Sequence, residues 1–390
     1  MLHINDLTYR IEGRLILDKA TAGIPSGHKV GLVGRNGTGK TTLLRIVAGE
    51  IHPDDGSLTT AKGDRIGYVQ QEAPGGPVSL IDWVLEADTE RARLLAEAET
   101  ATDGERIAEI HMRLSDMGAH AAPARAATIL AGLGFDETAQ QKPCSDFSGG
   151  WRMRVALAAV LFLEPELLLL DEPTNYLDLE GTLWLESYLK SYPHTVLMVS
   201  HDRDLLNRAV NAILHLDRGK LTYYTGGYDA FENARRERQM LDLKLKKKQD
   251  DQRRHMQAFV DRFRYKASKA RQAQSRIKQL EKMQDIAVPL EERTIPFHFE
   301  DPTELASPLV VLDECDLGYV AGKPVLKRVS LRLDHDDRIV IIGPNGQGKT
   351  TLVKSIAARL PLLTGKRVAS SKAVMGYFSQ DQLDELREGE

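Results

Sequence analysis

The sequence predicts an α/β fold with two nucleotide-binding units joined by a long helical linker, the second unit being only partly present. Three observations predict it. A phosphate-loop pattern directly follows an apolar strand, a second apolar strand ends in two carboxylates, and the phosphate-loop pattern recurs near the end of the chain. We expect residues 1–228 to form the first unit, 229–306 the linker and 307–390 the start of the second unit.

The first phosphate loop has the strand–loop–helix setting that nucleotide binding requires. Lys29–Val33 predicts a buried strand, Gly34–Thr41 fits the pattern G-x-x-x-x-G-K-[ST], and a helix should follow through about Ala48. In such a loop Lys40 reaches the β and γ oxygens, and Thr41 offers its hydroxyl to Mg²⁺. We therefore expect ATP to bind through Gly34, Asn36, Gly37, Gly39, Lys40, Thr41 and Thr42.

Ser145–Asp178 carries two further phosphate-handling features. Ser148, Gly149 and Gly150 precede a segment with helical spacing, and glycines at a helix start let backbone N–H groups approach an anion. Leu167–Leu170 predicts a buried strand that delivers Asp171 and Glu172 to its C-terminal edge. Asp171 is then placed to hold a Mg²⁺ shell and Glu172 to polarise an attacking water. The alternative is a glycine turn and a core strand with two capping acids.

The elements around these features are simpler. Leu2–Tyr9 alternates like an exposed strand, and Asp82 to about Leu133 is mostly helical, with breaks near Gly104, Gly118 and Pro123, which predicts a packing subdomain. Thr195–Ser200 predicts another buried strand that ends at His201. A histidine at that position is either structural or a sensor of the γ-phosphate, and the motifs already found favour the sensor.

The sequence then repeats itself at an offset of 309 residues. Gly343–Thr350 is a second phosphate loop, and the same offset relates Gly67-Tyr68 to Gly376-Tyr377. This shared register predicts a duplicated domain and a second ATP site. Its nucleotide ligands would be Gly343, Asn345, Gly346, Gly348, Lys349, Thr350 and Thr351, with Thr350 on Mg²⁺.

The segment between the two units is strongly basic. Residues 235–282 hold 17 Lys or Arg and 6 Asp or Glu, although the whole chain has a formal charge of −4. Residues 229–283 contain no Pro or Gly, which predicts long helix folded into a hairpin with its tip near 259–269. Aromatic residues mixed with cations favour RNA or DNA as a partner, and a solvated helical spacer is the alternative.

Composition narrows the class of protein. At 390 residues the chain has room for two or three domains, and its two cysteines lie far apart without metal-ligand spacing. The longest apolar stretch, Val155–Leu170, is interrupted by Glu164, Pro165 and Glu166, so we expect no membrane span. With no signal peptide, the cytoplasm is the expected location.

In this order, the phosphate loop, Ser-Gly-Gly, Asp-Glu-Pro-Thr-Asn and the strand-end His resemble the ABC ATPase superfamily. The residues of Phe147–Arg154 and Glu172–Asn175 resemble those of the ABC-F branch, which comprises soluble twin-cassette ATPases that act on ribosomes. SRIKQLEKM at 275–283 resembles its YheS-like subgroup. The resemblance covers the whole chain and implies cassettes that each have a mixed-sheet core and a helical subdomain.

The resemblance also implies roles for further residues. Tyr9 and Tyr319 would stack on adenine, Gln71 and Gln380 would be Q-loop residues that also face Mg²⁺, and Asp178 would be the D-loop residue, with His201 as the switch. The linker would contact tRNA and rRNA. We assign that contact to Arg262, Arg264, Lys266, Lys269 and Arg271.

Two departures from the family pattern stand out. Tyr176 replaces a usual His beside the catalytic group, with little expected consequence. The chain stops ten residues after Gln380, so we expect a truncated form with no complete composite site, which binds ATP but hydrolyses it weakly. Two copies pairing first cassette to first cassette would complete a site in trans. Two other functions stay open: the ATPase subunit of an ABC transporter and a DNA-associated ABC ATPase.

Overall fold

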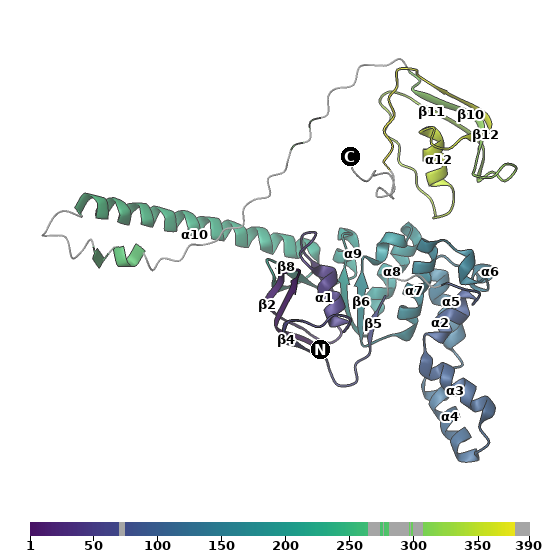
Figure 1. Ribbon diagram of the computed structural model, residues 1–390, viewed down its shortest axis with the longest axis horizontal. Helices are drawn as coiled ribbons and strands as arrows, with labels where there is room; N and C mark the ends of the chain where they lie inside the picture. The colour runs from purple at the N-terminus through teal and green to yellow at the C-terminus, as the bar shows by residue number, and fades with distance from the viewer. Residues whose placement is uncertain are drawn as a thin grey trace. The chain divides into compact units, whose positions relative to one another are not determined.

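The computed structural model describes residues 1–69, 75–263, 274–275, 277–280, 296, 298 and 307–378. These residues fall into two compact units. The first lies within Met1–Tyr176 and Leu183–Ile295, and the second within Leu177–Thr182 and Pro296–Glu390. Each unit is described by itself below (Figure 1).

Two sheets form the centre of the first unit. A three-stranded antiparallel sheet has the order β2 (Arg14–Ile24), β1 (Leu2–Ile11), β4 (Asp55–Thr59). The six-stranded sheet has the order β5-β6-β7-β3-β8-β9, in which β9 alone runs antiparallel to its neighbour. Its strands are β5 (Ile66–Tyr68), β6 (Leu167–Asp171), β7 (Thr195–Val199), β3 (Lys29–Val33), β8 (Ala212–Asp217) and β9 (Lys220–Thr225).

The inner strands are buried on both faces, which explains why they are continuous apolar runs rather than alternating ones. Leu167–Leu170 and Val196–Met198 are at most 2% exposed. The core extends to α1 (Lys40–Val47), which buries Leu43 and Leu44 against the sheets. Parallel strands deliver their C-terminal ends to one edge, so the loops after β3, β6 and β7 lie together there.

The predicted helical region, residues 82–133, consists of four helices: α2 (Leu80–Glu86), α3 (Thr89–Thr100), α4 (Gly104–Asp116) and α5 (Ala122–Gly132). Figure 1 shows α3 and α4 side by side at the end of this region. They form a small core of their own from Leu94, Ile110, Leu114 and Ala119. The short α6 (Glu137–Gln140) leads to α7 (Gly149–Leu163), which packs against α2 and α5.

The long helix α10 (Tyr228–Phe263) rises from the end of the same sheet. Its first turn packs through Phe231 against His215 on β8 and Tyr224 on β9, at ring-centroid distances of 5.1 Å. On the other side, Asp229 N donates to Asn207 Oδ1 (2.9 Å) in the last turn of α9 (Arg203–Arg208). The described part of α10 runs to Phe263, and the hairpin tip predicted near 259–269 lies mostly outside the described residues and stays a prediction.

The second unit repeats part of this plan. β10 (Val310–Leu317), β11 (Leu326–Leu333) and β12 (Leu362–Ala369) form an antiparallel sheet in the order β11-β10-β12, which matches β2-β1-β4. α12 (Lys349–Ile356) corresponds to α1, since its first and last residues are those of α1 plus the offset of 309. The unit also holds the first residues of α8 (Leu179–Ser191).

The predicted fold class is confirmed: a mixed α/β sheet core with a helical subdomain, a long helix after it, and a partial second copy. The strand and helix predictions around the first phosphate loop agree with β3 and α1. The domain boundaries at 228 and 306 stay predictions.

Candidate nucleotide-binding site

The first phosphate loop turns by means of glycines with positive φ. Gly37 has φ 75° and Gly39, the N-cap of α1, has φ 100°. A Cβ on Gly39 would collide with Ile16 Cγ2, so this position needs glycine for both its conformation and its space. The loop therefore presents its N–H groups at the start of α1, where the helix dipole favours an anion.

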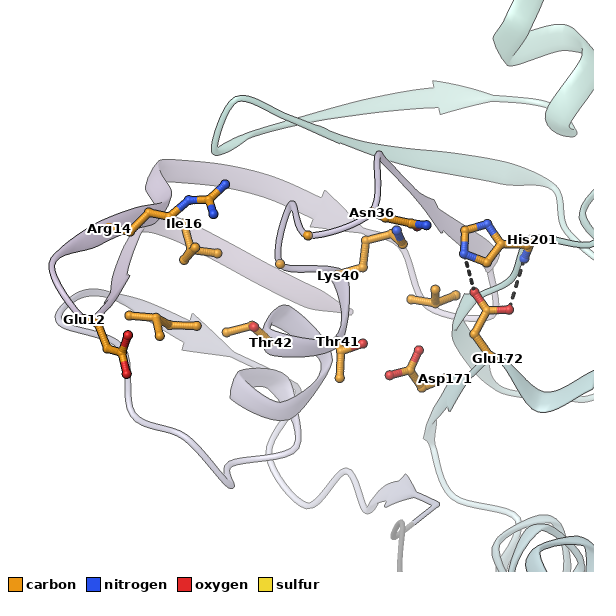
Figure 2. A pocket seen from close by; sticks show the side chains of 14 residues that line it. Glu12, Arg14, Ile16, Asn36, Lys40, Thr41, Thr42, Asp171, Glu172 and His201 are labelled. Atoms are coloured by element: carbon orange, nitrogen blue, oxygen red, sulfur yellow. Dashed lines mark hydrogen bonds and ion pairs between the residues drawn. The ribbon is translucent and has the colours of Figure 1, made fainter. Parts of the chain in front are cut away.

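Lys40 lies across this loop. Its Nζ donates to the carbonyl oxygens of Gly34 (2.9 Å) and Arg35 (3.1 Å). The pocket beside it has a volume of about 630 Å³ and contains Asn36, Gly37, Gly39, Thr41 and Thr42 of the predicted set (Figure 2). These residues suit the phosphates of a nucleotide.

Asp171 and Thr41 face the same pocket from β6 and α1. A hydroxyl and a carboxylate on neighbouring elements suit Mg²⁺ bound together with nucleotide phosphates, since Mg²⁺ prefers few protein oxygens and keeps several other ligands. Among the described residues no group of three or more His, Cys, Asp or Glu side chains forms a metal site without the nucleotide.

Glu172 and His201 are in contact. His201 N donates to Glu172 Oε2 (3.2 Å), and His201 Nε2 lies 3.2 Å from Oε1, as Figure 2 shows. The Glu172 side chain is 19% exposed, and Glu172 N is fixed to Val199 O at 2.9 Å. The histidine backbone and ring therefore orient this carboxylate from the neighbouring strand.

Two features mark Glu172 as more than a capping acid. Its φ of 48° lies in the left-handed region, which is uncommon for residues other than glycine and clusters at functional sites. Its buried Oε1 receives no well-directed hydrogen bond from the described residues, although His201 Nε2 is at ion-pair distance. A buried acceptor in this state calls for a functional explanation, and Glu172 lines the nucleotide pocket.

The far wall of the pocket was not anticipated. Ile11, Glu12, Arg14 and Ile16 come from the β1–β2 hairpin, which folds over the loop (Figure 2). Tyr9 is partly buried against the core of the first unit and is not among the residues that line this pocket, so its stacking on adenine stays a prediction. The only sequence signal for the hairpin was its tight turn at Glu12-Gly13.

Ser148, Gly149 and Gly150 lie at the start of α7, with Ser148 as N-cap, and do not line the pocket of the first loop. Ser148 and Gly149 are exposed. Near Gly150 lies the ring of Tyr176, 3.8 Å from where a Cβ would stand.

Arg154 was also missed. It is 1% exposed inside α7, its Nε donates to Tyr176 O (2.7 Å), and Nη1 donates to Leu133 O (2.9 Å). Its guanidinium lies 4.2 Å from the Trp151 ring centroid. This side chain ties α7 to the turn that follows Glu172.

The second unit holds the other predicted ligands. Lys349 Nζ donates to Gly343 O (2.6 Å) and Pro344 O (2.8 Å), as Lys40 does in the first loop. Thr351 Oγ1 lies 3.5 Å from Tyr319 Oη, so the predicted adenine-stacking residue is next to α12. Within this unit Asn345 N donates to Asp178 Oδ2 at 3.2 Å. The glycines Gly343, Gly346 and Gly348 have positive φ, and Thr350 follows Lys349 in α12.

Several predicted residues lie outside the described part of the chain: Gln71, Gln380, Arg264, Lys266, Lys269 and Arg271. Arg262 is described and is exposed in the last turn of α10. Within the described residues, no helix has the length and apolar character to cross a membrane.

Comparison with known proteins agrees with this geometry. A family model described as ABC transporter matches residues 17–175 and 326–388, and a second model with the same description matches 214–299. The chain is 42% identical over 393 residues to the probable ATP-binding protein YheS of Escherichia coli (strain K12). The aligned region covers 100% of this chain and 62% of that protein.

Relatives in eukaryotes are similar as well. ABC transporter F family member 3 of Arabidopsis thaliana is 39% identical over 99% of this chain and 57% of its own length. ATP-binding cassette sub-family F member 3 of Homo sapiens is 40% identical over 96% of this chain and 54% of its own length. The chain thus spans 54–62% of the length of these three relatives. It belongs to the ABC transporter family of ATP-binding cassettes, in the F branch that these relatives represent.

Proposed function

We propose that this chain is an ATPase whose nucleotide cycle controls the binding of its basic linker to ribosomal RNA and tRNA. ATP would bind with Mg²⁺ at the first loop, through Lys40, Thr41 and Asp171. The metal ion would supply charge that neutralises the phosphates. Glu172 would accept a proton from the attacking water while His201 holds the carboxylate in place.

One observation carries the proposal: β9 ends beside the start of β8, and the first two turns of α10 then lead back to a cavity beside the catalytic pair, which Phe231, Arg235 and His201 line. α9 starts two residues after His201, and Asn207 near its end accepts a hydrogen bond from Asp229 N at the start of α10. A movement of His201 on ATP binding or hydrolysis would therefore reach the base of α10 through the short helix α9. The exposed Arg262 lies in the last turn of the described helix.

We propose ribosomal RNA and tRNA as the nucleic acids because the resemblance to the F branch implies action on ribosomes. Between residues 235 and 282 the 17 basic side chains against 6 acidic ones supply attraction for any phosphate backbone. The cytoplasm would be the place of action. The chain spans only part of its relatives, so we propose that its own hydrolysis is weak and that first cassettes of two copies associate to complete a site.

The test is ribosome pelleting through a cushion, with the Glu172→Gln variant, with and without ATP, near physiological salt. Removing the carboxylate should trap the ATP-bound state, so ATP should increase co-pelleting. Changing Arg262, Arg264 and Lys266 to Glu should abolish it. The matched control changes Lys62, Lys190 and Lys372, all exposed on the cassettes, to Glu and should pellet normally.

Two results would contradict the proposal. One is ribosome binding that ignores both ATP and the linker charges. The other is preferential binding to duplex DNA over ribosomes at matched salt, which would favour a DNA-associated ATPase. Repeating a negative result with a longer chain that carries a second signature and Asp-Glu strand separates a wrong partner from an insufficient chain.

A further inference from the structure

A second cavity lies on the other side of the first phosphate loop. It has a volume of about 300 Å³ and lies where β3, β7 and β8 end and α10 begins. We call it the basal pocket, defined by Arg35, Lys40, Arg203, His215, Asp217 and Arg235. Lys40 and His201 line both this pocket and the nucleotide pocket, so the two cavities are neighbours.

The two cavities differ in charge. The nucleotide pocket has two basic side chains, Arg14 and Lys40, and three carboxylates, Glu12, Asp171 and Glu172. The basal pocket has four basic side chains and a single carboxylate, Asp217. A pocket with carboxylates suits a nucleotide that carries a metal ion, whereas an excess of arginine suits an oxyanion without one.

Two arginines of the basal pocket, Arg203 and Arg235, are available for such a ligand. Within the described residues, Arg203 and Arg235 form no ion pair with a carboxylate. The Arg203 guanidinium instead lies 5.1 Å from the ring centroid of Tyr228, which holds it in place without neutralising it.

The remaining wall adds hydrogen bonding and an apolar surface. Burial, followed by the charge of Arg235, lowers the pKa of His215, so its imidazole is neutral at pH 7 and can still donate or accept one hydrogen bond. Leu206 and Phe231 are buried beside it.

We propose that the basal pocket binds the inorganic phosphate produced by ATP cleavage before it leaves the protein. This inference rests on the proposed function. In the cleavage the water oxygen bonds to the γ-phosphorus, the bond from that phosphorus to the β–γ bridging oxygen breaks, and ADP, phosphate and a proton result. The phosphate then passes Lys40 and His201, the two residues that both cavities share.

Occupancy of the pocket would act on α10 directly. Tyr228, Phe231 and Arg235 stand on its first two turns and line the cavity. A phosphate held by Arg203 and Arg235 links α9 to α10 across the cavity. The base of the long helix would thus respond to phosphate after cleavage.

The test is equilibrium dialysis of the whole chain with radiolabelled inorganic phosphate at physiological ionic strength. A saturating non-hydrolysable ATP analogue with Mg²⁺ fills the γ-phosphate positions of the phosphate loops. Phosphate retained under these conditions must lie elsewhere. We expect R203Q/R235Q to weaken retention by at least about tenfold, since two charge-assisted contacts are lost.

Arg236→Gln is the matched control. Arg236 follows Arg235 on the same helix, pairs with Glu232 at 2.9 Å and does not line the pocket. It should retain phosphate like the unmodified chain. Circular dichroism and analogue binding on the same preparations show whether each variant is folded.

Two results would overturn the inference. One is loss of phosphate retention in the unmodified chain once the analogue is bound, which would confine phosphate to the nucleotide sites. The other is retention by the folded R203Q/R235Q variant at the level of the unmodified chain. ATP hydrolysis is measured separately, so its absence would contradict the proposed function without changing the phosphate result.

Discussion

The two phosphate loops share their local geometry and differ in what surrounds them. Gly39 and Gly348 have φ of 100° and 86°, each is the N-cap of an eight-residue helix, and each following lysine folds back onto two loop carbonyls. The two loops differ in the segment that precedes them. Val30 on β3 is 0% exposed, whereas its counterpart at the 309 offset, Ile339, is 55% exposed and lies in no strand.

The difference in exposure arises because β3 is flanked by strands of a sheet. β3 lies between β7 and β8, and Val30 pairs with Leu197 on one side and Ala212 on the other. In the described part of the second unit residues 338–342 have no such neighbours, and Val340 and Ile342 are 80% and 79% exposed. Loop and helix are therefore set by local sequence, while the strand before them needs partners distant in the chain.

The largest expected effect is on ATP hydrolysis, which we assign to the first phosphate loop and Glu172. Glu172→Gln should lower ATP hydrolysis by about 10²–10⁴-fold, because the general base is lost, while ATP binding persists. Phosphate release under single-turnover conditions measures it, with nucleotide binding by fluorescence as the control. Hydrolysis that survives Glu172→Gln would mean that a group other than Glu172 acts as base.

A charge placed at the two equivalent strand positions tests the difference in packing. Val30→Asp should cost at least about 3 kcal/mol of unfolding free energy, because it buries an unpaired carboxylate between two strands. Ile339→Asp should change stability by no more than about 0.5 kcal/mol. Urea unfolding measures both. Equal costs would show that Ile339 is packed in solution like Val30.

Removing each lysine sharpens the functional side of the comparison. Lys40→Ala and Lys349→Ala should each weaken ATP binding at its own loop by about 10–100-fold, since a charge-assisted contact to phosphate is lost. Titration calorimetry should show one of two sites disappear in each variant. A chain that loses both sites through one substitution would show that the loops do not bind independently.

The smallest expected effect concerns a contact in the first unit that has no counterpart in the described part of the second. Arg65 Nε and backbone N donate to Glu166 Oε2 at 3.0 and 2.9 Å, which joins the start of β5 to the start of β6. The position equivalent to Arg65 is Val374, which is 98% exposed. The hydrogen bonds from Arg65 lower the pKa of Glu166 to about 2 from its ordinary value of 4.5.

Because that pKa is lowered in the folded state, the tie stabilises the protein above pH 4.5 and its contribution is lost as pH falls toward 2. Arg65 is 60% exposed, so solvent screening reduces the benefit to about 1 kcal/mol. Glu166→Gln should show this loss in urea unfolding at pH 7 and progressively less below pH 4.5. Glu232→Gln, which removes an i,i+4 pair within α10 rather than a tie between two strands, is the control and should change little.

The sequence was sufficient for what depends on neighbouring residues. Lys29–Val33, Gly34–Thr41 and the helix after them follow from local pattern, and the Asp171-Glu172 strand followed from its apolar run. The pocket wall did not, because Ile11 and Ile16 reach the loop through the β1–β2 pairing. Register shifts beside Tyr9 also change which side chains of β1 face the pocket, and no alternation pattern predicts them.

Arg154 shows a second limit. A charged residue in the apolar run of α7 would be assigned to the surface by pattern, yet it is buried because two carbonyls and an indole ring satisfy it. Such an arrangement depends on Leu133 and Tyr176, which lie 21 and 22 residues away. Reading one helix at a time cannot supply them.

The length of α10 has a mechanical consequence. With 36 residues, the helix is a rod of about 54 Å at about 1.5 Å per residue. A tilt of about 5° at its base would therefore carry the far end through about 5 Å, close to the rise of one helical turn. Arg262 stands at that far end. A tilt that hardly displaces Tyr228, Asn207 and His215 at the base would thus move this arginine by more than about 3.4 Å, the axial spacing of successive phosphates on one strand of DNA.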